Sequence, residues 1–294
     1  MALYVDAPSW PAHGTRFGHL VSDRDLRELH DFAAGLGLPV RAFELDHYDL
    51  PEHLWQPAVD AGARPVTRPE LLRALTAGGL RVRGRDRPAA LRRRRDADLA
   101  RRWRRLGARL PVARPAGWAA LGAELLDRWD EPHRGYHASG HLADVLDRLD
   151  RLTGDEPGGP PARGRGEPLL RHEEPRDGAV PPAVALAAWF HDAVHTGHTP
   201  QDETASADLA IDRLTALGLP DNAAQRVGEL VLATAGHTGA GTDPGRHHDR
   251  LHDRRHDRAA LLCDADLGIL GAGERRYRAY AAGVRAEYPD VDDA

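Results

Sequence analysis

Residues 187–192, Ala-Ala-Trp-Phe-His-Asp, place an imidazole and a carboxylate side by side at the end of an apolar run. Such groups are costly to bury unless they are paired or bound to a metal. His191 and Asp192 together suit a divalent metal ion that keeps one coordination position open for water. A His-Asp dipeptide also arises by chance, so the doublet gains weight only from similar groups elsewhere in the chain.

Two further segments carry groups of this kind. His137 and His141 are four residues apart at the start of an expected helix, so both are expected on one helix face. Asp264 and Asp266 lie within a second apolar stretch, Leu-Leu-Cys-Asp-Ala-Asp-Leu. A lone histidine is more often a helix cap or a surface residue. Three expected helices that each place ligand-type groups beside a buried stripe indicate one shared metal site.

The spacing of apolar residues predicts an all-helical fold from about residue 97 onward. The expected helices in the part that bears these groups cover residues 137–152, 182–194, 201–217, 221–235, 258–270 and 274–288. Two segments lack any apolar period, residues 154–181 and 236–257, and we interpret both as mobile insertions.

The first 85 residues follow another pattern, in which the apolar period switches between 2 and 3.6. This switch predicts a small α/β domain. Strands are expected over residues 2–7 and 40–45 and a helix over 23–35, and Thr67 is expected to cap a further helix. An Arg-rich linker, residues 86–96, then leads to the helical domain at 97–294. The fold class is therefore mostly α, preceded by a small α/β domain.

Composition limits the classes of partner. The chain has 294 residues and a net charge of −5, which argues against a nucleic-acid or membrane-surface protein. All basic residues are arginine, so abundant arginine is weak evidence for phosphate binding. Cys263 is the only cysteine, which excludes an intrachain disulfide and suits a reducing compartment. No signal peptide or membrane span is visible, so we expect a cytoplasmic protein.

The α/β domain has its own concentration of polar residues at expected strand ends and in the loops after them. They are Asp6, His13, Arg16, His19, Asp46, His47 and Asp49. Sites gather at such positions on α/β scaffolds, but turns also favour Asp and His. The Tyr-Val-Asp start, the Phe-Gly-His-Leu turn and the Asp-His-Tyr-Asp motif resemble an uncharacterised bacterial and phage family, known only as a domain of unknown function. That family implies no activity.

The helical domain carries a resemblance of its own. The order His…His-Asp…Asp on a helical scaffold resembles the HD-domain superfamily. The motifs Tyr-His-x-x-x-His-Leu, Ala-Trp-Phe-His-Asp-Ala-Val and Asp-Ala-Asp-Leu-x-Ile-Leu-Gly resemble a bacterial group of predicted metal-dependent HD phosphohydrolases, as does Arg-Tyr-x-x-Tyr-x-x-x-Val-Arg-x-Glu-Tyr. The resemblance covers roughly residues 97–294. Relatives usually continue beyond the last of these motifs, so a site that is more open, less stable or inactive is expected in this chain.

The resemblance implies a set of metal ligands: His141, His191, Asp192 and Asp266. It implies a divalent ion, and Mn²⁺, Fe²⁺, Mg²⁺, Ni²⁺ and Zn²⁺ all suit these donors. Asp264 competes with Asp266, but the last ligand of the family sits in an Ala-Asp-x-Leu context, which matches Asp266. His237 is a weaker candidate for a second metal, because a histidine at a helix C-terminus also has a structural explanation.

Further residues receive catalytic or substrate roles. Asp192 counts as catalytic as well as a ligand, and Glu203 is expected to hold or deprotonate the attacking water. An ordinary first-turn glutamate, favoured by the helix dipole, is an equal alternative for Glu203. Arg134, His137 and Arg285 are expected to contact the substrate phosphate.

Together these features predict a metal-dependent hydrolase of a small phosphate ester, with a nucleotide as the expected substrate. A nucleotide-binding regulatory HD module without turnover is one alternative; the complete ligand set favours the hydrolase. A metal-dependent activity seated in the N-terminal Asp/His cluster is another. The sequence does not determine the substrate, the metal or the oligomeric state.

Overall fold

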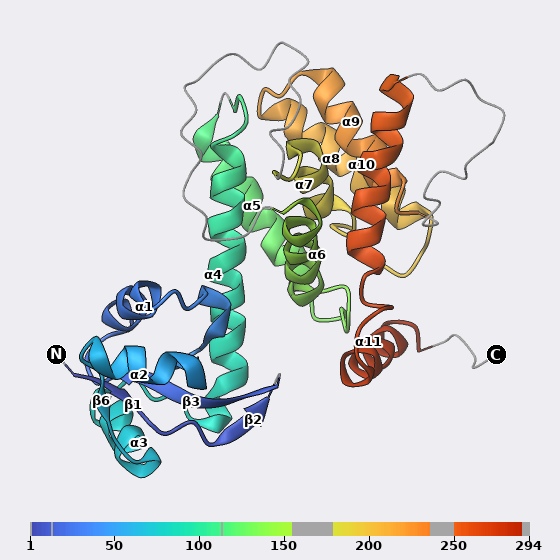
Figure 1. Cartoon of the computed structure of the whole chain (residues 1–294). Coiled ribbons are helices and arrows are strands. Elements are labelled where there is room, and N and C mark those ends of the chain that lie inside the picture. The colour runs from blue at the N-terminus through green and yellow to red at the C-terminus, as the bar shows by residue number, and fades with distance from the viewer. Residues whose placement is uncertain (1, 13, 113, 155–178, 236–249, 290–294) are drawn as a thin grey trace. The chain divides into compact units, whose positions relative to one another are not determined.

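The computed structural model describes residues 2–12, 14–112, 114–154, 179–235 and 250–289, and only the backbone of Arg41 and of residues 250–257. The chain forms two compact units, Met1–Arg94 and Arg95–Ala294, termed the N-terminal and C-terminal units (Figure 1). The first contains a small sheet with helices, and the described part of the second is helical. The protein is therefore mostly α with a small α/β N-terminal region.

The N-terminal unit is built on one mixed sheet. Its strands are β1 (Leu3–Val5), β2 (Trp10–Ala12), β3 (Thr15–Ser22), β4 (Phe43–Glu44), β5 (His47–Pro51) and β6 (Arg64–Pro65). They follow the order β4-β5-β3-β1-β6, and β2 pairs with β3 off this path. Only the pairing of β1 with β6 is parallel. The long strand β3 is therefore the centre of the sheet.

Helices cover both faces of this sheet. Buried side chains of α1 (Leu26–Gly35) and α2 (Glu52–Asp60) share a core with Leu20 and Tyr48. On the opposite face, α3 (Arg68–Ala77) packs against Val21. Alternate residues of a strand point to opposite faces, which explains why neighbours on β3 belong to different cores. Short 3₁₀ turns lie at Val40–Ala42 and Gly84–Asp86.

Several local predictions for this unit need correction. The β2–β3 hairpin was not expected, because a proline, a histidine and glycines interrupt its apolar alternation. It turns at Gly14, whose φ is +76°, and Trp10 stacks on Phe17. The helix expected over 23–35 begins only at Leu26, because Asp25 caps it by accepting from the Glu28 N–H. The strand expected over 40–45 is shortened to β4 by the 3₁₀ turn before it.

The expected Arg-rich linker, residues 86–96, is mostly helical. From Arg87 onward it forms the first half of α4 (Arg87–Gly107), which crosses the boundary between the two units. Arg87 pairs with Glu44 at 2.5 Å, and Arg94 donates to the Phe43 carbonyl at 2.7 Å. Arginine is a good helix former, and these contacts within the N-terminal unit order its first turns.

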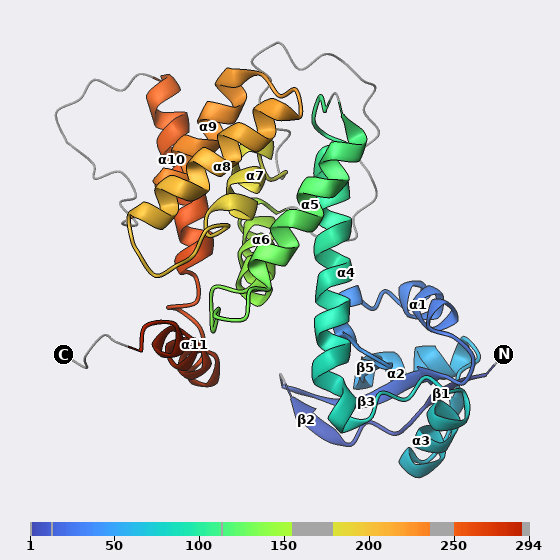
Figure 2. The ribbon, with the colours of Figure 1, turned by 180° about the vertical axis from the view of Figure 1, so that it is seen from behind.

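The C-terminal unit is a helical bundle around one apolar helix. Its elements after α4 are α5 (Pro115–Trp129), α6 (Ser139–Thr153), α7 (Pro182–Phe190), α8 (Gln201–Ala216), α9 (Asp221–Leu232), α10 (Arg250–Leu267) and α11 (Glu274–Glu287). Every residue of α7 from Val184 to Phe190 is buried, and α7 contacts α6, α8, α9 and α10. Helices α8 and α9 lie side by side next to it (Figure 2). No described helix has the length and apolar character needed to cross a membrane.

Two helix boundaries differ from expectation in ways that affect the site. Helix α6 begins at Ser139, so His137 lies in the turn before it and not in its first turn. Helix α10 begins at Arg250, within the segment expected to be an insertion up to 257. Residues 155–178 of the expected insertion 154–181 lie outside the described part of the chain, as do residues 236–249 of the expected insertion 236–257.

Tryptophans fix the position of α7. Trp103 of α4 and Trp118 of α5 stack with centroids 4.0 Å apart, and each indole N–H donates to the backbone carbonyl of the other. Trp129 of α5 donates to the carbonyl of Trp189 at 3.0 Å. Buried indoles need such acceptors, so these contacts specify how α4, α5 and α7 pack. The end of α7 is thereby held in place.

Candidate metal centre

The His-Asp doublet lies where α7 ends. His191 is the C-cap residue of α7 and is 1% exposed, and its backbone N–H still donates to the Ala187 carbonyl. Its Nδ1 lies 2.9 Å from the carbonyl oxygen of Ala188. A carbonyl only accepts, so Nδ1 carries a proton, and Nε2 is the nitrogen whose lone pair the ring offers when it is neutral, as in a metal complex.

Three elements bring four of the expected side chains together. His141 comes from the first turn of α6, Asp192 directly follows His191, and Asp266 lies near the end of α10. The two imidazole Nε2 atoms lie 3.1 Å apart. A carboxylate oxygen of Asp266 lies 2.9 Å from the His141 Nε2, and one of Asp192 lies 3.2 Å from the His191 Nε2. We call His141, His191, Asp192 and Asp266 the helical cluster.

The two aspartates of α10 differ in orientation. Asp264 is exposed, whereas the Asp266 side chain is 12% exposed and faces both imidazoles. Arg148 of α6 donates to the Ala265 carbonyl at 3.0 Å and so ties this part of α10 to α6. Of the two competing aspartates, Asp266 is the one that the fold places beside His141.

The charges of the cluster are strongly coupled. Burial alone would lower the pKa of His191, but the Asp192 and Asp266 carboxylates outweigh it and raise that pKa well above its usual value. Burial alone would raise the pKa of Asp192, but the His191 imidazole reverses this and holds the pKa well below its usual range. The cluster therefore favours positive charge between its carboxylates.

The donor set fits a divalent metal ion. Two imidazoles and two carboxylates are donors that Mn²⁺, Fe²⁺ and Zn²⁺ accept. The lone pair of the His191 Nε2 points at another imidazole nitrogen, a contact that a cation between them would satisfy. The Nδ1 of His141 is buried and has no hydrogen-bond partner among the described residues. One ligand atom each from His141, His191 and Asp192 lie within 4.8 Å of one another.

A second group of ligand-type side chains lies next to the helical cluster. It consists of His137, His195 and Glu287, and we call it the Glu287 group. His137 donates through Nδ1 to Glu287 at 2.6 Å, and the imidazole rings of His137 and His195 lie 4.4 Å apart. The rings of His137 and His141 lie 5.6 Å apart, which connects the two groups.

Glu287 is almost fully buried, with 2% of its side chain exposed. Its Oε1 accepts from the backbone N–H groups of Tyr136 and His137 at 2.7 and 2.8 Å. Burial alone would raise the pKa of Glu287, but the hydrogen bonds from His137 and the nearby His195 imidazole, 3.5 Å away, hold it well below its usual range. Glu287 therefore fixes the turn before α6 as an anion.

His195 and Glu287 are two residues of this group that the sequence did not single out. Glu287 lies in a motif that carries the family resemblance, and His195 directly follows another, which ends at Val194; that was the only available signal. Their contact depends on close packing of α11 against the turn before α6, where a Cβ on Gly135 would lie 2.4 Å from the Gly283 carbonyl oxygen. Arg276 of α11 also pairs with Asp144 of α6 at 2.6 Å.

Arg134 has a different environment from the one its expected phosphate contact requires. Its side chain is buried and donates to the Glu131 carboxylate, to the carbonyls of Asp192 and Ala193, and to the carbonyl of His137. These bonds engage all three guanidinium nitrogens. We therefore assign Arg134 a positioning role, in which it holds the turn before α6 against the backbone of the doublet.

The loop after the doublet is held by α8. Asp202 accepts from the backbone N–H of Thr196 at 2.7 Å and from that of His198 at 2.9 Å. Glu203, one residue further along α8, accepts from the Thr199 hydroxyl, and its Oε2 is buried with no partner among the described residues.

Burial raises the pKa of Tyr288, and the nearby carboxylates, including those of Asp192 and Glu203, raise it further.

The remaining expected residues are less informative. Arg285 is exposed on α11. His237 lies outside the described residues. Tyr136, which was not singled out, packs its ring 4.7 Å from that of His141. Its buried hydroxyl has no hydrogen-bond partner in the described part of the chain, and burial and the charge of Asp266 raise its pKa well above the usual value.

Comparison with protein-family models matches residues 3–78 to a family described as a protein of unknown function, DUF4031. This match confirms that the N-terminal segment resembles a family of unknown function. It covers about a quarter of the chain and does not reach the C-terminal unit, for which the HD resemblance stays a prediction. Comparison with curated proteins and with solved structures found no match.

Proposed function

We propose that the C-terminal unit is an HD-type, metal-dependent phosphohydrolase that acts on a small phosphate ester, with a nucleotide as the expected substrate. The observation that carries the proposal is the meeting of two imidazoles and two carboxylates from α6, the end of α7, and α10. Their order along the chain is the one that the family resemblance implies. The phosphate chemistry and the substrate class depend on that resemblance.

The four side chains of the helical cluster are the proposed metal ligands. A divalent ion bound there would polarise a phosphoryl oxygen and lower the pKa of a bound water. The protein contributes a buried, rigid frame, since His191 is fixed by the Ala188 carbonyl and Asp192 by the contact of Arg134 with its backbone. Such fixed ligands reduce the reorganisation that binding and reaction require.

Other side chains have proposed roles in binding and proton transfer. Glu203 would accept a proton from the attacking water, because its Oε2 is buried and has no described donor. His137 would bind a phosphate oxygen, since Glu287 engages its Nδ1 and leaves Nε2 as the donor toward substrate. Burial lowers the pKa of His137, but the Glu287 and Asp192 carboxylates outweigh it and raise that pKa, which favours the cationic form.

The direct test is phosphate release from a panel of nucleotides and simple phosphate esters. Metal-stripped full-length protein is assayed with and without added Mn²⁺, beside Asp192→Ala and the control Asp212→Ala, an exposed aspartate of α8. We expect metal-dependent turnover that is lost in Asp192→Ala and kept in Asp212→Ala.

Two other outcomes contradict the proposal. Turnover that survives in Asp192→Ala would place the chemistry outside the helical cluster. Tight Mn²⁺ binding that depends on Asp192, with no turnover of any substrate, would indicate the regulatory binding module in place of the hydrolase.

A further inference from the structure

The N-terminal unit carries a second gathering of ligand-type residues on one face of its sheet. His19 of β3 and Asp49 of β5 lie directly opposite each other in the antiparallel ladder. His47 precedes Asp49 by two residues on β5 and therefore projects to the same face. Their neighbours Leu20 and Tyr48 point to the other face and are buried in the core. We call His19, His47 and Asp49 the sheet cluster.

The sheet cluster is compact enough for one ion. Each of its three residues offers a ligand atom, and these atoms lie within 4.8 Å of one another. The two imidazole centroids lie 5.0 Å apart, and the His47 Nε2 lies 3.5 Å from an Asp49 carboxylate oxygen. Cross-strand pairing alone produces this arrangement, because opposed side chains on one face are always close.

Each imidazole of the sheet cluster has a carboxylate behind it. Asp6 accepts from the Nδ1 of His19 at 3.0 Å, and Asp46 accepts from the Nδ1 of His47 at 2.7 Å. A carboxylate that engages Nδ1 fixes the tautomer and leaves Nε2 as the nitrogen with a free lone pair. Metal-binding histidines in proteins are usually oriented in this way.

The two supporting carboxylates are themselves held firmly. The Asp46 side chain is fully buried and also accepts from the Arg81 guanidinium at 3.0 Å and from the Val82 N–H at 2.7 Å. Asp6 is 2% exposed and also accepts from the His19 N–H at 2.5 Å. Burying two carboxylates is costly, and a fold that needed only ion pairs could place them at the surface.

The three proposed ligands of the sheet cluster are more exposed to solvent than the two carboxylates that support them. The side chains of His19, His47 and Asp49 are 13%, 15% and 28% exposed. Three protein donors that retain contact with solvent leave coordination positions for water or a small ligand. Sites of two histidines and one carboxylate with open positions suit divalent first-row transition metals.

We propose that His19, His47 and Asp49 bind a divalent transition-metal ion. Asp6 and Asp46 orient the two imidazoles from behind. All residues of this proposed site belong to the N-terminal unit, and none is a proposed ligand of the phosphohydrolase centre.

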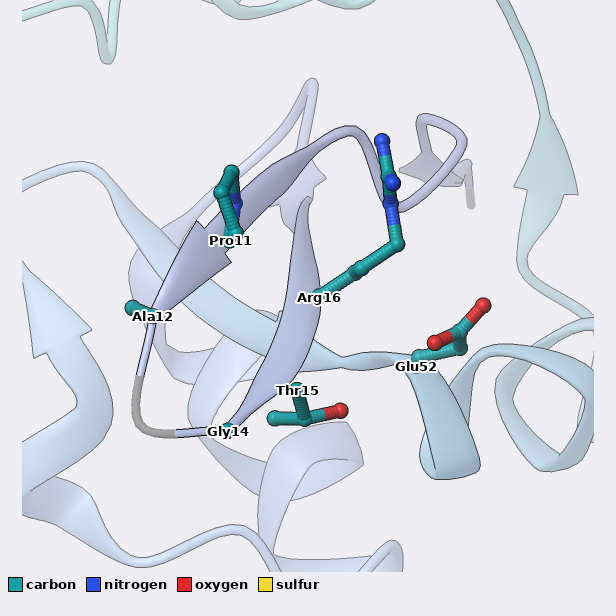
Figure 3. A pocket seen from close by; sticks show the side chains of 6 residues that line it. All are labelled: Pro11, Ala12, Gly14, Thr15, Arg16 and Glu52. Carbon is teal, nitrogen blue, oxygen red and sulfur yellow. The ribbon is translucent and has the colours of Figure 1, made fainter.

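Two other polar residues of this region have different positions. His13 lies outside the described residues. Arg16 donates to the carbonyls of Pro8 and Ser9 and lines a shallow surface pocket beside the β2–β3 hairpin, with Glu52 across from it (Figure 3). That pocket contains no residue of the sheet cluster, so it does not enter the proposal.

The experiment measures binding of Co²⁺ alone to the full-length chain, by equilibrium dialysis with metal analysis and by visible absorption. It is done in the wild type and in His191→Ala, which removes a ligand of the helical cluster. The test variants are His47→Ala and the milder Asp49→Asn. The control is His53→Ala, an exposed histidine on α2 of the same unit. Circular dichroism and thermal melting establish that each variant is folded.

We expect His191→Ala to keep a bound Co²⁺ that is lost, or weakened at least about 100-fold, when His47→Ala or Asp49→Asn is added. His53→Ala should bind Co²⁺ like its parent. The proposal is overturned if folded His47→Ala and Asp49→Asn bind as much Co²⁺ as the wild type, or if His191→Ala binds none.

Discussion

The helical cluster and the sheet cluster use the same donors in two different frameworks. In the helical cluster, the side chains of His141 and His191 are 1% exposed, and their ring nitrogens face each other. In the sheet cluster, His19 and His47 keep partial contact with solvent, and each has a carboxylate behind it. The two proposed sites therefore differ in how far their imidazoles are buried and in whether carboxylates support them.

The difference shows how each framework positions ligands. In the sheet, the register of β3 against β5 places His19 opposite Asp49, so two strands are sufficient. The helical cluster needs α6, α7 and α10 to pack correctly before its ligands meet. A change in helix packing should therefore disturb the helical cluster from a distance, whereas the sheet cluster should respond to its immediate neighbours.

The largest expected effect concerns the two aspartates of α10. Asp266→Asn removes a proposed ligand that lies 2.9 Å from the His141 Nε2, while Asp264→Asn changes an exposed side chain two residues away. Mutation of a residue that hydrogen-bonds to a metal ligand typically lowers metal affinity or activity about 10- to 100-fold, and loss of a ligand itself should cost more. We therefore expect turnover to fall more than about 100-fold in Asp266→Asn. Phosphate release at saturating Mn²⁺ measures it.

The same pair tests whether the two clusters are independent. Asp264→Asn should remain within about twofold of the wild type, since exposed substitutions rarely matter. Co²⁺ bound at the sheet cluster should be unchanged in both variants. Equal loss of turnover in the two variants would mean that the acidity of α10 matters and that Asp266 has no special place.

Much of this arrangement could be predicted from sequence. The four side chains that meet in the helical cluster are those that the order His…His-Asp…Asp singles out, because short motifs at helix ends carry a local signal. The capped helix α3 was also predictable, since Thr67 and Glu70 form a capping box. Local chemistry at a helix start is visible in a few consecutive residues.

Long-range contacts could not be predicted in this way. The bond from His137 to Glu287 joins residues 150 positions apart, and no periodicity reveals it. The cross-strand pairing of His19 with Asp49 stayed hidden because the β2–β3 hairpin lacks a clear alternation of apolar residues. Arg134 looked like a phosphate contact, and only its burial against several backbone carbonyls shows what engages it.

Asp6 accepts from the Nδ1 of His19, a proposed ligand of the sheet cluster. Among the described residues, the imidazoles of the helical cluster have no carboxylate at Nδ1. In Asp6→Asn, the amide oxygen can still accept from the His19 N–H, but its NH₂ group would face the Nδ1 of that ring. This favours the tautomer with the proton on Nε2, which blocks metal binding there. We expect Co²⁺ affinity to fall about 10- to 100-fold.

Asp31→Asn is the matched control, because Asp31 is 76% exposed on α1 of the same unit. It should leave Co²⁺ affinity unchanged, and neither variant should alter phosphate release. An Asp6→Asn protein that melts like the wild type and binds Co²⁺ normally would remove the proposed orienting role of Asp6.

Two closely packed glycines test whether each cluster responds to its immediate neighbours or to distant helix packing. A Cβ on Gly18 would lie 2.6 Å from the Asp6 carbonyl oxygen, and a Cβ on Gly135 would lie 2.4 Å from that of Gly283. Each alanine variant should lose about 1–3 kcal/mol through overpacking. Gly18→Ala should weaken Co²⁺ binding at the sheet cluster and leave Mn²⁺ affinity and KM unchanged. Gly135→Ala should displace α11 with Glu287, and so raise KM while Mn²⁺ affinity is kept.

Gly35→Ala is the control, since a Cβ there would meet nothing within 4 Å. Metal affinities and KM are measured side by side in the three variants. If Gly135→Ala also weakened Mn²⁺ binding, the Glu287 group would be part of the metal site, and the separation between ligands and substrate contacts would fail.

The smallest expected effect concerns Asp202, which braces the loop that follows the doublet. Asp202→Asn keeps the size of the side chain but weakens its bonds to Thr196 and His198, so we expect a loss of about 1.5 kcal/mol in the free energy of unfolding. Chemical denaturation measures it, with the exposed Asp208→Asn of α8 as the control. The residues of the sheet cluster belong to the N-terminal unit and Asp202 to the C-terminal unit, so Co²⁺ binding there should be unaffected.

The pH dependence of this loss identifies its cause. Burial alone would raise the pKa of Asp202, but hydrogen bonds from Thr196 and His198 outweigh it and hold the pKa below its ordinary value of 3.8. A carboxyl group with a depressed pKa in the folded state stabilises the protein fully above that ordinary value, and loses the stabilisation as the pH falls through the folded-state pKa. The wild type should therefore exceed Asp202→Asn by a constant margin near neutral pH, and the margin should shrink below pH 3.8. A margin that is independent of pH would mean that the shape of the loop, and not the charge of Asp202, supports the helical cluster.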